Sequence, residues 1–200
     1  MPVADLDSGL HALAGHGVVD ALAEFIARTF IYVAVAGFAV LWLRRDALRA
    51  GLAGLAGALA GLGVAAAIGL VWDRPRPFEA GHYPPLVAHA TDASFPSDHL
   101  VVMGALTAAA WLCWRRIGVA LAIVAVLLAG ARGIVGIHYA SDLVGGFLIG
   151  AACAVVGWWA LTPALPVIDA VDRRLVQLRL RRPEPKERPA LPIDSIEPQV

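Results

Sequence analysis

Hydrophobic and polar positions along the chain fall into long blocks. All of the charged residues lie between or beyond five uncharged stretches, Thr29–Leu43, Ala50–Trp72, Leu100–Trp114, Ile117–Ala131 and Leu143–Ile168. A helix needs roughly 20 apolar residues to cross a bilayer. The second and fifth stretches exceed that length, and the shorter three can span if flanking arginines reach toward the headgroups. No stretch has the pattern of a strand. The chain is therefore predicted to be an all-α, polytopic integral membrane bundle of about five transmembrane helices.

Both ends of the chain are more polar than its middle. Residues 6–26 mix apolar side chains with charged ones, which favours an amphipathic N-terminal helix at the membrane interface, or a sixth helix packed against the bundle. The tail over 169–200 is first basic and amphipathic, then rich in proline and charge, which is typical of disorder. We expect a membrane domain over 1–168, followed by this tail.

Composition supports the membrane assignment, since 59% of residues are hydrophobic and only 16% are charged. The net charge is zero, so nothing indicates a nucleic-acid partner. Cys113 and Cys153 lie in apolar stretches and are predicted to be packing residues. The first residues lack a basic segment, so no cleaved signal peptide is expected.

The arginines predict the orientation in the membrane. Successive helices cross the bilayer in opposite directions, so the segments after the first, third and fifth stretches lie on the same side. Each of these segments carries a cluster of arginines: Arg44, Arg45 and Arg49; Arg115 and Arg116; and Arg173, Arg174, Arg179, Arg181 and Arg182. Positive charge accumulates on the cytoplasmic side of membrane proteins. The tail is therefore predicted to be cytoplasmic, and the loops 73–99 and 131–142 extracytoplasmic.

Glycines recur at four-residue spacing in two of the stretches. Gly57 and Gly61 form one pair and Gly146 and Gly150 another. Small residues at this spacing let helices approach closely in lipid. These pairs predict helix packing and carry no chemistry.

The segment 131–142, ARGIVGIHYASD, places ionisable residues beside apolar stretches, which is costly and marks a candidate site. His138 and Asp142 are four residues apart, so on a helix they share a face and the carboxylate can orient the imidazole. Arg132 offers a planar group suited to phosphate oxygens. The alternative is a purely structural set of helix-end residues.

The long loop contributes two further motifs, WDRPRPF at its start and SFPSDH at its end. Prolines hold an extended backbone around Arg74 and Arg76. Ser97 is a predicted N-cap, where free N–H groups and a hydroxyl can bind a phosphate oxygen. His99 follows within one turn and can protonate a leaving oxygen. Each motif alone also fits a structural role, but all three converge on one face.

Together these residues resemble the type 2 phosphatidic acid phosphatase superfamily, whose pattern is Lys, six residues, Arg-Pro; then Pro-Ser-Gly-His; then Ser-Arg, five residues, His, three residues, Asp. The chain has Arg76-Pro77, Pro96-Ser97-Asp98-His99, and Arg132 followed by His138 and Asp142 at the same spacing. RPRPF with FPSDH most resembles the bacitracin-resistance type of undecaprenyl pyrophosphate phosphatase.

Three positions depart from the family pattern. The lysine position holds Gly69, and the single lysine of the chain is Lys186 in the tail. Arg74 is the predicted replacement for that cation. Asp98 stands at the motif glycine and Ala131 at the motif serine.

The resemblance implies hydrolysis of undecaprenyl pyrophosphate without metal or other cofactor. His138, oriented by Asp142, would attack the terminal phosphorus to give a phosphohistidine, and His99 would protonate the leaving group. Arg76, Arg132, Ser97 and Arg74 would bind the phosphate oxygens. The expected partners are a polyprenyl or other lipid phosphate and membrane lipids. The alternatives are a phosphatidic acid or phosphatidylglycerophosphate phosphatase, and a non-catalytic lipid-phosphate binder or transporter.

Overall fold

The computed structural model describes residues 9–41 and 47–178. Its helices are α2 (Gly17–Leu41), α3 (Ala47–Val71), α4 (Asp98–Cys113), α5 (Arg115–Ile134), α6 (Ala140–Ala160), the short 3-10 helix η1 (Thr162–Ala164) and α7 (Leu165–Gln177). Arg44, Arg45, Lys186 and the arginines of the tail beyond residue 178 lie outside the described residues.

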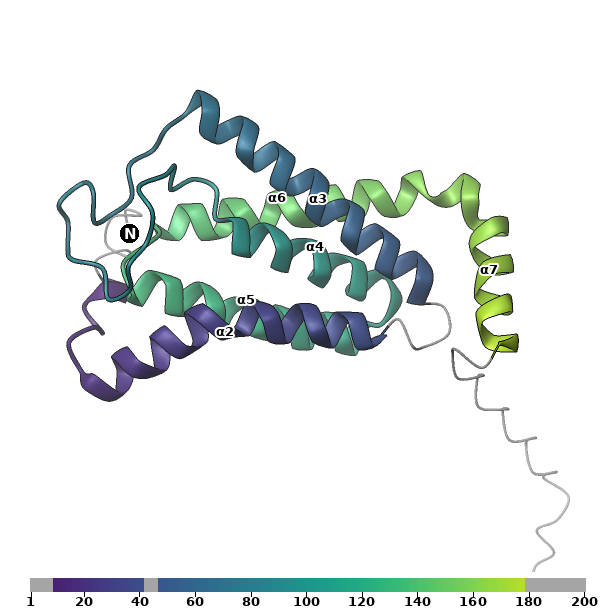
Figure 1. The fold of residues 1–200 in the computed structure, drawn as a ribbon, viewed down its shortest axis with the longest axis horizontal. Coiled ribbons are helices and arrows are strands. Elements are labelled where there is room, and N and C mark those ends of the chain that lie inside the picture. The colour runs from purple at the N-terminus through teal and green to yellow at the C-terminus, as the bar shows by residue number, and fades with distance from the viewer. Residues whose placement is uncertain (1–8, 42–46, 179–200) are drawn as a thin grey trace, which may run out of the picture.

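The helices form a bundle, and the all-α prediction is confirmed (Figure 1). Helix α4 lies at its centre, where it packs against α3, α5 and α6. Its inward side chains are fully buried, as Val101 and Met103 show. Helix α2 packs along α5 on the outside of the bundle (Figure 1).

Helices α2 to α6 correspond to the five apolar stretches of the sequence. Within the described part of the chain, three helices are long and apolar enough to cross a bilayer, Leu48–Val71, Arg115–Ile134 and Ala140–Ala160. Helix α4 is apolar but shorter, with 16 residues. The chain is thus an integral membrane protein whose central helix is the shortest of α2 to α6.

The N-terminal helix differs from the prediction over 6–26. A turn interrupts the chain before Gly17, and α2 then continues without a break to Leu41. Gly15 has a φ of +91° and donates its N–H to Asp20, which explains the turn. Residues 18–36 contain neither proline nor glycine, so nothing ends the helix near position 26, and Glu24 and Arg28 also pair along it. The amphipathic segment and the first apolar stretch are therefore one helix.

The helix formed by the last apolar stretch also ends before Ile168. Helix α6 stops at Ala160, and Pro163 and Pro166 lie in the following turn and at the start of α7. Proline lacks the N–H that would continue the helix, so α7 leaves at a steep angle to α6 (Figure 1). The predicted boundary at 168/169 therefore falls inside α7.

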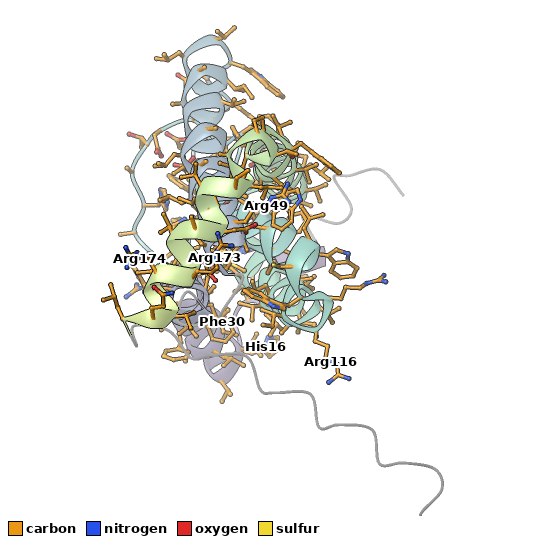
Figure 2. All side chains as sticks on the ribbon, turned by 90° about the vertical axis from the view of Figure 1, so that its right-hand side faces the viewer. His16, Phe30, Arg49, Arg116, Arg173 and Arg174 are labelled. Atoms are coloured by element: carbon orange, nitrogen blue, oxygen red, sulfur yellow. The ribbon has the colours of Figure 1, made fainter. Side chains whose placement is uncertain are left out.

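The two ends of the bundle have different character. Figure 2 shows Arg49, Arg116, Arg173 and Arg174 at the end that carries α7. The long loop after α3 and the loop between α5 and α6 lie at the opposite end (Figure 1). The basic residues and the predicted site residues are thus separated by the length of the bundle.

The paired glycines lie at close helix contacts. A Cβ added to Gly57 would lie 2.5 Å from the Ala154 backbone, and one added to Gly61 would lie 2.7 Å from Val101. On α6, Gly146 meets the backbone of Ser97 at the start of α4. Small residues therefore set the spacing between the helices that carry the motifs.

Candidate active site

The candidate active site lies where the long loop and the starts of α4 and α6 meet the end of α5. The turn after α5 delivers His138 to this point. Gly136, with a φ of +78°, donates its N–H to the Gly133 carbonyl, and the Ile137 N–H reaches the Arg132 carbonyl. This is a Schellman motif, which glycine favours at its left-handed position. It stops α5 and turns the chain back beside Arg132.

Asp142 lies in the first turn of α6, and its carboxylate accepts the Tyr139 N–H at 2.9 Å, as in a capping box. Its backbone carbonyl accepts the Ser97 N–H at 3.1 Å. One residue thus joins the starts of α6 and α4. His138 precedes α6, so the prediction that it shares a helix face with Asp142 is wrong.

The ring of His138 is buried and has one defined tautomer. Nδ1 lies 3.0 Å from the Ser94 carbonyl oxygen, which can only accept, so Nδ1 carries the proton. Nε2 lies 3.1 Å from Nη2 of Arg132, which can only donate, so Nε2 holds a lone pair. The two contacts agree, and they leave Nε2 as the nucleophilic nitrogen.

Burial is the largest of the effects that lower the pKa of His138 to about 4; the Arg132 and Arg76 charges act in the same direction, while Asp142 opposes them. The imidazole is therefore neutral at pH 7. A neutral imidazole with a directed lone pair is the form that can attack phosphorus.

Arg76 is also buried, although it comes from the long loop. Its Nη1 donates to the Ile137 carbonyl at 2.9 Å and lies 3.3 Å from Nε2 of His138. Asp92 binds the other side of the guanidinium, at 2.9 Å from Nε and 2.8 Å from Nη2. Two arginines thus converge on Nε2, where a phosphate would sit.

Arg74 has a different environment from Arg76. Its Nη1 donates to Asp142 at 2.6 Å and to Ser141 at 2.7 Å, and its guanidinium stacks on Tyr139. It is absent from the cavity beside His138. The structure therefore gives Arg74 a carboxylate partner behind the site.

Two buried polar atoms near the site lack hydrogen-bond partners among the described residues. They are the hydroxyl of Ser97 and Nε of Arg132. Ser97 is the N-cap of α4, as predicted, but its hydroxyl caps no N–H group of that helix. Buried donors are normally paired, and of the two residues only Arg132 lines the cavity where a ligand could supply an oxygen.

A cavity of about 490 Å³ opens beside these residues. Its polar side contains Arg76, Arg132, His138 and His99, and its apolar side is formed by Leu62, Ala65, Ala66 and Gly69 of α3. Ser97 and Asp142 do not line it. The predicted site residues are therefore brought together, with Arg76, Arg132, His99 and His138 facing the cavity and the others behind them.

Sequence reasoning missed three residues at this site. Ser94 contacts both His138 and Asp142, and Asp92 holds Arg76. His89 is half-buried and lines the cavity, with its ring 6.3 Å from that of His138. Their position in the motif-bearing loop was the available signal, but no spacing rule singles them out.

Over residues 9–41 and 47–178, no three His, Cys, Asp or Glu side chains group as a metal site. The arrangement instead joins a neutral nucleophile, a second histidine and two buried cations. Such a set can neutralise phosphate oxygens while a nucleophile attacks phosphorus. Fold and site together are those of a membrane-embedded phosphatase.

Comparison with known proteins gives the family. Residues 47–165 match the PAP2 superfamily, and the chain belongs to it. It is 32% identical over 176 residues to the undecaprenyl-diphosphatase BcrC of Bacillus subtilis (strain 168), which covers 84% of this chain and 89% of BcrC. It is 38% identical over 147 residues to YbjG of Escherichia coli (strain K12), a candidate undecaprenyl-diphosphatase by name, with 70% of this chain and 74% of YbjG covered.

The fold has a relative among solved structures. The crystal structure of Aquifex aeolicus LpxE superimposes with a TM-score of 0.65 at 20% identity, covering 76% of this chain and 92% of LpxE. The predicted superfamily resemblance is confirmed, and so is the resemblance to undecaprenyl pyrophosphate phosphatases. The chain is a hydrolase of the PAP2 superfamily.

Proposed function

We propose that the chain hydrolyses undecaprenyl diphosphate to undecaprenyl phosphate and inorganic phosphate. The observation that carries the proposal is the pair of buried arginines that converge on the unprotonated Nε2 of His138. The relatives named undecaprenyl-diphosphatases support the substrate.

In the first step, Nε2 of His138 forms a bond to the terminal phosphorus as the bond to the bridging oxygen breaks. The leaving lipid phosphate takes a proton from His99, which lines the same cavity. Arg76 and Arg132, which line the cavity, bind the oxygens of the transferred group. The Arg132 N–H that points at Nε2 of His138 donates instead to a phosphate oxygen. This exchange frees the Nε2 lone pair for attack on phosphorus.

In the second step, water attacks the phosphohistidine and gives its proton to His99. The bond from Nε2 to phosphorus breaks, and inorganic phosphate leaves. His138 and His99 thereby return to their starting states, so each turnover consumes one water and needs no other reactant.

The shape of the cavity supports a lipid substrate. Its apolar wall on α3 contains the small residues Ala65, Ala66 and Gly69 beside the polar centre. A diphosphate can bind the arginines while the chain attached to it lies against this wall. Gly69 stands where the family has a lysine, so the wall is apolar at a position that otherwise carries charge.

We also propose that the site faces the extracytoplasmic side and the tail the cytoplasm. Arg49 and Arg116 lie near the starts of α3 and α5, and Arg173 and Arg174 lie on α7, at the end of the bundle opposite the loops that carry the site (Figure 1). Positive charge near the ends of membrane helices is retained in the cytoplasm. A cysteine placed at exposed His82 should therefore react with a membrane-impermeant maleimide in intact spheroplasts. Labelling only after permeabilisation would reverse the orientation.

The test of the function is phosphate release by the purified protein in detergent with EDTA present. Undecaprenyl diphosphate, phosphatidic acid and phosphatidylglycerophosphate should be compared. His138→Ala should abolish release, whereas the matched variant His82→Ala should retain it, because His82 is exposed and lies outside the cavity. Labelled substrate should give an acid-labile phosphoprotein in the wild type and none in His138→Ala.

The other outcomes decide between the alternatives. Preferred release from a glycerolipid would keep the chemistry and change the substrate class. Lipid-phosphate binding without release from any substrate would indicate a binder or transporter.

A further inference from the structure

The contact between Asp142 and His138 is indirect. The nearest carboxylate oxygen, Oδ2, lies 3.7 Å from Nδ1, which is too long for a hydrogen bond. Ser94 contacts both residues and so links them. Its carbonyl oxygen is 3.0 Å from Nδ1, and its hydroxyl donates to Oδ2 of Asp142 at 2.5 Å.

Ser94 is itself held firmly. It is fully buried and does not line the cavity. Its N–H donates to the Arg74 carbonyl at 2.8 Å, and the Arg74 side chain donates to Asp142. Arg74, Ser94 and Asp142 therefore form a closed ring of hydrogen bonds behind the nucleophile.

We propose that Ser94 is a positioning residue for His138, with its carbonyl holding the Nδ1 proton and its hydroxyl keeping the Asp142 carboxylate off the ring. The proposal rests on the proposed function and adds to it the route by which Asp142 acts. Asp142 orients the imidazole through Ser94, and Arg74 neutralises Asp142 from the other side.

The physical reason lies in how strongly the Asp142 charge acts on His138. A carboxylate in direct contact with Nδ1 would stabilise the imidazolium form and raise its pKa. It would also draw the ring away from the cavity, where phosphorus must lie. The other ionisable groups that face His138 are Arg76 and Arg132, which oppose protonation, and the rings of His89 and His99.

Removing the hydroxyl alone tests this arrangement, because Ser94→Ala leaves the backbone carbonyl in place. We expect Asp142 to close on Nδ1, so that the acidic limb of the kcat profile moves up by roughly one pH unit. The loss of alignment should lower kcat about tenfold or more. KM should stay close to the wild-type value, since Ser94 does not line the cavity.

Two variants separate positioning from a merely structural role. Ser94→Thr keeps a hydroxyl and should restore the position of the acidic limb. In the Asp142→Asn background, Ser94→Ala should give no upward shift, because no carboxylate remains to approach the ring. The proposal would be overturned if the acidic limb of the kcat profile stayed at the wild-type pH in Ser94→Ala. It would also be overturned if Ser94→Ala shifted that limb equally in the Asp142→Asn background.

The imidazole can also be followed without turnover. Ring ¹⁵N shifts of His138 should report the Nδ1–H tautomer in the wild type and a raised pKa in Ser94→Ala, also where a variant is inactive. Wild-type protein that releases no phosphate would refute the proposed function, while this titration would still decide the role of Ser94. An unchanged ring titration in Ser94→Ala would refute the positioning role alone.

Discussion

Adding one methyl group to Gly146 should disturb catalysis through helix packing. Its Cβ would lie 2.5 Å from the Ser97 carbonyl oxygen and 3.2 Å from the Ser97 nitrogen. A carbon and a carbonyl oxygen normally approach to about 3.3 Å, so the start of α4 must retreat by about 0.8 Å. That retreat moves Ser97 and His99 away from His138, and it stretches the 3.1 Å bond from Ser97 to Asp142.

We expect Gly146→Ala to lower kcat/KM by about ten- to a hundredfold, since a shift near 1 Å costs that much. The free energy of unfolding should fall by about 1–3 kcal/mol, the usual cost of overpacking. Phosphate release and thermal unfolding in detergent measure the two effects. The control is Gly63→Ala on α3, where an added Cβ meets nothing within 4 Å. Equal activity and stability in the two variants would refute the close approach of α4 and α6.

Four further outcomes are expected. The ring ¹⁵N shifts of wild-type His138 should remain those of a neutral imidazole from pH 7 to 5 and change only near pH 4, because the pKa of His138 is lowered to about 4; a titration near pH 6.5 would contradict its burial. By linkage, stability should decrease as the pH falls from 6.5 toward 4, where the unfolded chain binds a proton that the folded His138 does not, and thermal unfolding at pH 7 and 4.5 measures this. His99→Asn should slow phosphatidic acid more than undecaprenyl diphosphate, because a leaving alkoxide needs a proton more than a leaving phosphate does; equal losses would argue against His99 as the acid. Arg49→Met should lower the free energy of unfolding by about 1–3 kcal/mol while kcat is unchanged, because Arg49 binds the Trp158 carbonyl and Thr162 far from the site; a loss of activity at full stability would contradict this.

Much of the fold followed from the sequence, because a bilayer imposes its thickness on the chain. Long uncharged stretches must become helices in lipid, and five of them did. The boundaries were less predictable where local signals decide them. Gly15 and Asp20 set the start of α2, and Pro163 ended α6 within an apolar stretch that continues to Ile168.

The site was predictable in its members and less so in their partners. Motif spacing identified His138, His99, Arg76 and Arg132, which face one cavity. The spacing of four between His138 and Asp142 suggested a direct contact on one helix. The turn at Gly136 places His138 before α6 instead, so the ring meets the Ser94 carbonyl.

The sequence by itself determined the helices, the ends of the bundle where charge gathers, and the residues available for chemistry. These depend on composition and on short-range spacing. Only the tertiary structure decided that Arg74 binds Asp142, that Arg76 faces His138, and that Ser94 stands between nucleophile and carboxylate. Those contacts join segments that lie about 45 to 70 residues apart. They are set by how closely the helices pack, and no spacing along the chain encodes that distance.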